Sequence, residues 1–100
     1  MIRSVKIGPH VYKVLSEDRD GDDFGSTDVR RCEIRVSSKQ SPSQSRETLL
    51  HETLHALLTV TGLASELGDD MEEKVATRLA PALLDSLRRT PALVAFLVDG

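Results

Sequence analysis

The segment SPSQSRETLLHETLHALLTVTG, residues 41–62, decides how this chain folds. Its leucines recur at helical spacing, which predicts an amphipathic helix: Leu49, Leu50, Leu54, Leu57 and Leu58. Ser41 is a suitable N-cap, Pro42 suits the first helical position, and Gln44 can complete a capping box. Gly62 is a natural stop at the other end, so the helix should occupy most of this segment.

The middle of this segment has the pattern H-E-x-x-H, from His51 through Glu52 to His55. Positions i and i+4 share one face of an α-helix, so both imidazoles can reach a single metal ion. The intervening Glu52 can then take a proton from a zinc-bound water as general base. The pattern predicts a Zn²⁺ site in which His51 and His55 are metal ligands and Glu52 is catalytic. The alternative is a metal-free helix with two partly buried histidines and a solvated glutamate.

A catalytic zinc ion usually has three protein ligands and a water molecule. The sequence after His55 does not continue as G-x-x-H, which argues against a third histidine on the same helix. A carboxylate between residues 66 and 73 is the better candidate. Glu72 shares a helix face with apolar residues that should pack on the motif helix: Val75, Ala76, Leu79 and Leu83. Because Glu73 is rotated by about 100° from that face, we prefer Glu72 as third ligand, with Glu73 as second choice.

Several other residues could assist the chemistry, and the sequence does not choose among them. His10, Tyr12 or an arginine could stabilise a developing oxyanion. An acidic residue, equally suited to a turn or cap, could orient a ligating imidazole: Asp28, Asp69 or Asp70. Cys32 could serve as a thiolate ligand, but a half-buried strand residue is the preferred interpretation.

The residues on either side of the motif helix predict an α+β fold. Three alternating segments predict strands of a small antiparallel N-terminal sheet: residues 2–7, 11–15 and 32–36. Phe24–Asp28 has the composition of a turn. A second long helix should begin after an Asp69 or Asp70 cap and reach about Arg89, with a kink or break at Pro81. A short C-terminal helix should follow Thr90. About three strands should therefore pack on two long helices and this short one.

Length and composition narrow the possibilities further. One hundred residues suit one domain, 1–100, with a β half (1–38) and an α half (41–100). The net charge of −3 and the scattered basic residues argue against nucleic-acid binding. There is no apolar run of membrane-spanning length and no signal-peptide core, so neither a membrane partner nor export is expected. A single cysteine fits a reducing, cytoplasmic location, and the oligomeric state stays open.

The stretch TLLHETLHAL, residues 48–57, resembles the small zincin-like metallopeptidases, most closely compact phage- and prophage-encoded relatives of the ImmA/IrrE type. Phe24–Asp28, before the strand that contains Ile34 and Val36, looks like their pre-helix strand. Residues 72–84 look like their second helix. The resemblance implies a minimal zincin-like fold, Zn²⁺ and a peptide or protein substrate. It also implies that His51, His55 and Glu72 are ligands, that Glu52 is the base, and that the site of action is the bacterial host cytoplasm.

Three functions compete on this basis. The first is a zinc-dependent metallopeptidase that aligns an extended peptide along the sheet edge by strand addition. The second is a zinc-binding zincin-fold scaffold or interaction module without proteolytic turnover, because so short a chain has little room for a lid or a substrate domain. The third is a metal-free helical adaptor whose motif arose by chance.

Overall fold

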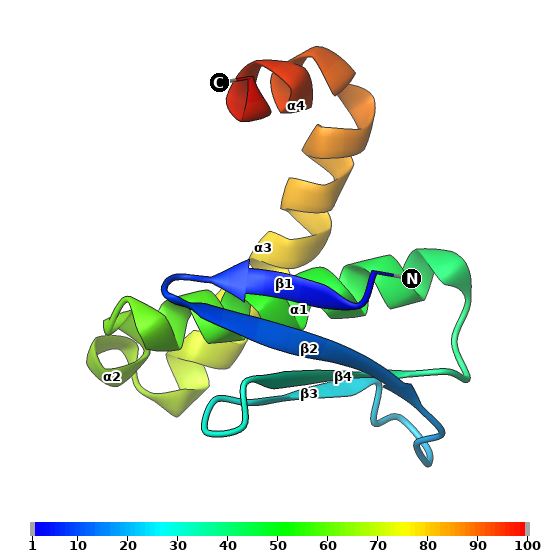
Figure 1. Ribbon diagram of the computed structural model, residues 1–100, viewed down its shortest axis with the longest axis vertical. Coiled ribbons are helices and arrows are strands. Elements are labelled where there is room, and N and C mark those ends of the chain that lie inside the picture. Colours follow the sequence, from blue (N-terminus) through cyan, green and yellow to red (C-terminus); the bar gives the residue numbers. More distant parts are fainter. Residues whose placement is uncertain (1, 100) are drawn as a thin grey trace.

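The computed structural model describes residues 2–99 as a small sheet covered by helices (Figure 1). The elements follow one another in the order β1 (Ser4–Ile7), β2 (His10–Glu17), β3 (Gly25–Asp28), β4 (Glu33–Ser37), α1 (Pro42–Val60), α2 (Leu63–Leu67), α3 (Asp69–Arg89) and α4 (Pro91–Val98). The strands precede the helices along the chain, so the α+β class predicted from the sequence is confirmed.

The sheet is mixed, with the strand order β1-β2-β4-β3. The β1–β2 and β3–β4 pairs are antiparallel, whereas β2 and β4 are parallel. The sequence predicts about three antiparallel strands, and the difference is β3, whose residues Gly25–Asp28 have the composition of a turn. This strand, GSTD, has no apolar alternation, because it lies at the sheet edge and contacts α1 through small side chains.

The motif helix α1 forms the middle layer of the structure. It contacts β1, β3 and β4 on one side and α3 on the other, and α3 reaches no strand within residues 2–99. The predicted capping box is present, because Ser41 Oγ accepts from the Gln44 amide and the Gln44 side chain returns to the Ser41 amide. Gly62 follows the helix with a φ of 82°, which confirms the predicted stop.

The core lies between the sheet and α1. Its fully buried members are Ile7, Tyr12, Ile34, Val36 and Ala56, with Val14 close to fully buried. The buried residues that α3 contributes are small, since Ala76 and Ala80 are both inaccessible to solvent. Small side chains let two helices approach closely, and this approach brings the first turn of α3 to the motif.

Helix α3 differs from the prediction in two details. Its N-cap is Gly68, with no side-chain cap, and Asp69 and Asp70 are already helical. The helix also continues through Pro81 to Arg89 without a break. Pro81 and Thr77, whose carbonyl loses its intrahelical donor, are both exposed, so water can satisfy that carbonyl.

No helix within residues 2–99 combines the length and apolar character needed to cross a membrane.

Gly25 fixes how closely β3 approaches α1. A Cβ at this position would lie 2.7 Å from the Arg35 carbonyl oxygen and 2.7 Å from Thr48 Cγ2, and the first of these neighbours is backbone. We predict that Gly25→Ala lowers the free energy of unfolding by about 1–3 kcal/mol, the usual cost of overpacking. Urea denaturation measures this change. The control is Ser26→Ala on the same strand, which adds no atom; equal stability of both variants would contradict the close approach.

Candidate metal centre

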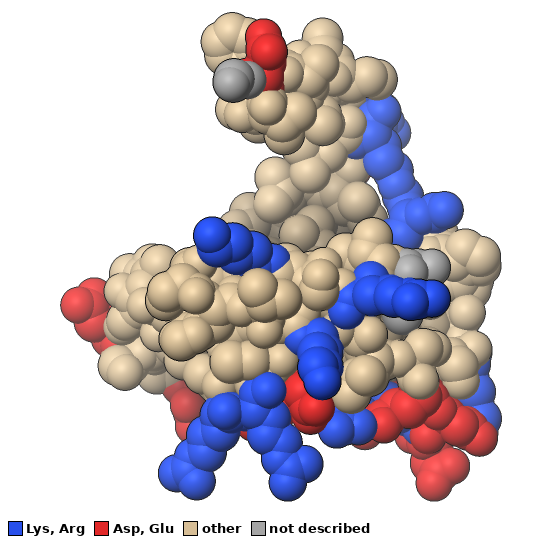
Figure 2. All heavy atoms as spheres, viewed as in Figure 1, with Lys and Arg blue, Asp and Glu red and all other residues tan. Residues whose placement is uncertain are grey.

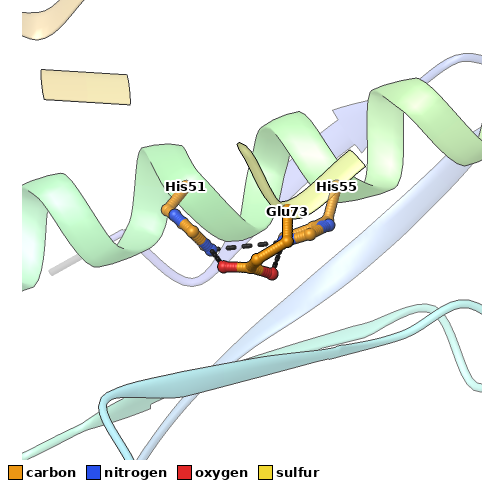
Figure 3. Close-up of side chains that lie close together, drawn as sticks. All are labelled: His51, His55 and Glu73. Carbon is orange, nitrogen blue, oxygen red and sulfur yellow. Dashed lines mark hydrogen bonds and ion pairs between the residues drawn. The ribbon is translucent and has the colours of Figure 1, made fainter. Parts of the chain in front are cut away.

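The histidines of the motif converge on one point beside α1 (Figure 3). One helical turn separates His51 from His55, and their Nε2 atoms lie 3.1 Å apart. Both rings are partly buried, because α3 covers this face of α1. Their tips therefore meet where a third group from α3 can reach them.

That third group is Glu73, in the first turns of α3. Its Oε1 lies 3.2 Å from His51 Nε2, and its Oε2 lies 3.0 Å from His55 Nε2. One ligand atom from each of these residues can be chosen so that all lie within 4.8 Å of one another. Figure 3 shows the carboxylate spanning both ring tips. The cluster of His51, His55 and Glu73 is called the metal cluster below.

Glu72, which its helix face favours as the third ligand, contacts the other ring nitrogen of His55. Its Oε2 is 2.5 Å from His55 Nδ1, the ring nitrogen nearer the backbone. Glu72 points into the α1–α3 contact and so meets the near side of the ring. Glu73, at the rim of that contact, reaches the far nitrogen instead. Helix phase correctly indicates that Glu72 packs against His55. It does not indicate that Glu73, at the rim of the contact, reaches the distal nitrogen Nε2.

The contact with Glu72 favours one tautomer of a neutral His55 ring. A carboxylate accepts, so His55 Nδ1 carries the proton, and in the neutral ring Nε2 presents only a lone pair. That lone pair faces the Glu73 carboxylate at 3.0 Å. Two acceptors at this distance repel each other unless a cation, either a proton or a metal ion, lies between them.

The spacing of the donor atoms fits a metal such as zinc. Ligands 2.0–2.1 Å from a tetrahedral zinc ion are separated from each other by about 3.3 Å. The two Nε2 atoms lie 3.1 Å apart, and each lies 3.2 or 3.0 Å from a different oxygen of the Glu73 carboxylate, distances close to this value. Two imidazoles, a carboxylate and a second carboxylate behind one ring are also the donor chemistry of a zinc site.

Glu73 is held in its anionic form. Partial burial by itself raises the pKa of Glu73, but the Thr77 hydroxyl donates to Oε1 at 3.0 Å and the two histidines attract the charge. The sum of these effects lowers the pKa below its ordinary value. The cluster therefore offers a negative ligand over the whole neutral range.

Glu52 faces the sheet rather than α3, and its partner there is Thr27 of β3. Glu52 is only 8 % exposed. The Thr27 hydroxyl lies 2.8 Å from Glu52 Oε1, to which it donates, and 3.1 Å from the Glu52 carbonyl oxygen. The other carboxylate oxygen, Oε2, is 4.0 Å from His51 Nε2. One oxygen is thus fixed by β3, and the other stays beside the metal cluster.

Two cavities meet at Glu52, one on each side of the metal cluster. The first, of about 370 Å³, lies toward the start of β3 and includes Phe24, Gly25, His51 and Glu73 in its lining. The second, of about 270 Å³, lies toward the end of β3 and includes Thr27, His55 and Glu72. Together they follow the free edge of β3 past the reactive groups.

Comparison with known families identifies this architecture. The model of the IrrE N-terminal-like domain, Peptidase_M78, matches residues 6–85. The chain belongs to this family. The match includes the motif, the metal cluster and Thr27, and it confirms the resemblance to zincin-like metallopeptidases of the ImmA/IrrE type. A metallopeptidase family implies a metal cofactor and peptide or protein substrates. Neither a curated protein nor a solved structure gave a match to the chain.

The other candidates from the sequence lie away from the metal cluster of this IrrE-like domain. Tyr12 is fully buried in the core, where burial raises its pKa, so it is not available to a substrate. His10 is exposed at the β1–β2 turn. Cys32 precedes β4, with a φ of 53°, and packs against the core. Asp28 accepts from the Arg31 amide in the turn after β3.

Thr27 is the functional partner that sequence reasoning missed. It belongs to the segment Phe24–Asp28, which has the composition of a turn, and nothing in this segment indicates contact with a residue twenty-five positions later. The only signal in the sequence is the resemblance of this segment to the pre-helix strand of the IrrE-like family. A strand there, adjacent to the motif helix, brings a hydroxyl to Glu52.

We predict that Thr27→Val lowers the free energy of unfolding by about 1–3 kcal/mol, because the buried Glu52 carboxylate loses its donor. Thr27→Ser, which keeps the hydroxyl, should cost clearly less. Chemical denaturation of both variants, with and without Glu52→Ala, completes a double-mutant cycle. If Thr27→Val is as costly in the Glu52→Ala background, the effect does not come from this hydrogen bond.

Proposed function

We propose that the chain is a zinc-dependent metallopeptidase whose ligands are His51, His55 and Glu73. The observation that carries this proposal is the convergence of two Nε2 atoms, 3.1 Å apart, on the carboxylate of Glu73, which offers one oxygen to each ring. His55 Nε2 and the Glu73 carboxylate lie 3.0 Å apart, and a cation bound between them would stabilise this contact. Membership of a metallopeptidase family supports the same assignment.

Glu52 is proposed as the general base. Bound zinc would supply Lewis-acid chemistry, polarising the scissile carbonyl and lowering the pKa of water. Glu52 would accept the proton of the attacking water on Oε2, while Thr27 holds Oε1 in place. The same carboxyl group would then give its proton to the leaving amine. Glu72 would fix the tautomer and orientation of His55 from behind.

The free edge of β3 is proposed as the substrate platform. An extended peptide can add to such an edge through main-chain hydrogen bonds, with its side chains alternating between two faces. The cavities at the two ends of β3 would receive side chains on either side of the scissile bond. Glu52 lines both cavities, so the scissile carbonyl would pass directly beside the base.

Replacing the base tests the proposal most directly. Glu52→Gln should reduce peptide cleavage by about 100- to 10,000-fold, since it removes general-base catalysis, and should leave zinc binding in place. A library of unstructured peptides with varied sequences, analysed by mass spectrometry, detects cleavage whatever the side-chain preference of the site. Glu66→Gln, on the exposed side of α2, is the matched control.

Unchanged cleavage by Glu52→Gln would remove Glu52 from this role. If the wild-type protein binds zinc with unit stoichiometry and is stabilised by it, yet cleaves no peptide in the library, the scaffold without turnover becomes the better description.

The two adjacent glutamates make different predictions for metal affinity. Glu72→Gln should weaken zinc binding by about 10- to 100-fold, the usual effect of losing a residue that orients a ligand. Glu73→Gln should weaken binding by more than this, because it removes a ligand itself. Competition with a chromophoric chelator measures both affinities. The opposite order would make Glu72 the ligand, as helix phase predicts.

A further inference from the structure

Helix α4 is apolar on every side and covered on none. Its sequence, PALVAFLV, contains no polar residue, and each of its residues is exposed. Phe96, Leu97 and Val98 expose 80, 64 and 76 % of their surface. A helix that is hydrophobic all round is normally buried, so this one lacks a covering partner within residues 2–99.

The helix sits at the end of an arm that leaves the body of the protein. Figure 1 shows the second half of α3 rising away from the sheet, with α4 turning off its end. Among the elements, α4 contacts α3 alone. Figure 2 shows this arm as mostly uncharged surface, with basic side chains along one side and an acidic tip. The arm, defined here as residues 83–98, also lies almost wholly beyond the family match, which ends at residue 85.

We propose that the arm is a dimerisation surface and that its occupant is the arm of a second copy of this chain. The largest apolar patch on a typical monomer measures about 300–600 Å². The exposed large side chains of α4 follow one another without a polar residue between them: Leu93, Val94, Phe96, Leu97 and Val98. Two-fold pairing would bury these side chains on both copies at once, so each contributes twice to an interface, which needs roughly 1,000 Å² in all to be stable.

The charges at the two ends of α4 are complementary under two-fold symmetry. Arg88 and Arg89 precede the helix, and Asp99 follows it. Helix α4 is about 12 Å long. In an antiparallel pair of α4 helices, Asp99 of each copy would lie beside Arg88 and Arg89 of the other. Arg89 already pairs with Asp85 in its own helix, which leaves Arg88 as the residue best placed for this contact.

A membrane surface fits the same helix less well. Helices that lie in a membrane interface have a polar face rich in Lys and Arg, which anionic lipids attract. Helix α4 has no polar face, it ends at Asp99, and the chain carries a net charge of −3. A second copy therefore explains both the uniform apolar surface and the charges at its ends.

Sedimentation equilibrium of the 100-residue chain tests the proposal. The 11.0 kDa protein should sediment at twice this mass at high micromolar concentration. Phe96→Glu and Val98→Glu should each raise the dimer dissociation constant by at least about 100-fold, because the change occurs twice in one interface. Val11→Glu, at an equally apolar and exposed position on β2, should leave the dissociation constant unchanged.

A charge exchange tests the antiparallel arrangement. Arg88→Glu should weaken the dimer, and adding Asp99→Lys should restore it, because the pair is then inverted. Failure of this rescue would overturn the antiparallel pairing.

A wild-type monomer at every concentration, or a dimer that survives both glutamate substitutions in α4, would overturn the interface itself. Binding of the monomer to phosphatidylglycerol vesicles, lost in Phe96→Glu, would assign the helix to a membrane instead. None of these measurements depends on metal or on proteolysis.

Discussion

The constraint on which the structure depends is that α1 must be packed on two sides at once. His51 and His55 share the face that meets α3, whereas Glu52, about 100° further round, meets β3. Each layer satisfies a different part of the motif, because α3 supplies carboxylates to the imidazoles and the sheet supplies a hydroxyl to Glu52. The close β3 approach allowed by Gly25 and the close α3 approach allowed by Ala76 and Ala80 are therefore requirements of the same five residues.

This arrangement concentrates negative charge and lone pairs beside a partly buried pair of rings. Glu52, Glu72 and Glu73 all lie within 4.0 Å of a histidine nitrogen, and no Lys or Arg makes an ion pair with them within residues 2–99. Carboxylates held together without compensating cations cost stability. A cation that bound only the folded state would recover this cost, and metal binding and folding would then be thermodynamically linked. Because the core has few aromatic residues, metal binding would contribute a larger share of the folding stability.

The sequence predicted the features that depend on local chemistry. The capping box at Ser41 and the Gly62 stop could be read directly, because each involves residues within one turn of one another. The features that the sequence did not predict depend on contacts between distant segments. Strand β3 exists because β4 and α1 hold it, and its four polar or small residues carry no sign of this. The choice between Glu72 and Glu73 as third ligand stays a prediction, because it depends on which histidine nitrogen each one reaches, whereas periodicity describes only the backbone face.

Helix α3 links the metal cluster to the arm, and its length separates their consequences. Glu73 is in its first turns and Leu87 in its last, which a helical rise of 1.5 Å per residue places roughly 20 Å apart. The cavities beside β3 are lined by β3 and its adjoining loops, by α1 and by the start of α3, and no residue of the arm is among their lining residues. An interface on the arm would thus leave the free edge of β3 open. It would restrain the C-terminal half of α3, the helix that carries Glu72 and Glu73. Its direct effect on the cluster would be confined to stiffening α3, because the packing of Ala76 and Ala80 on α1 already fixes the first turns.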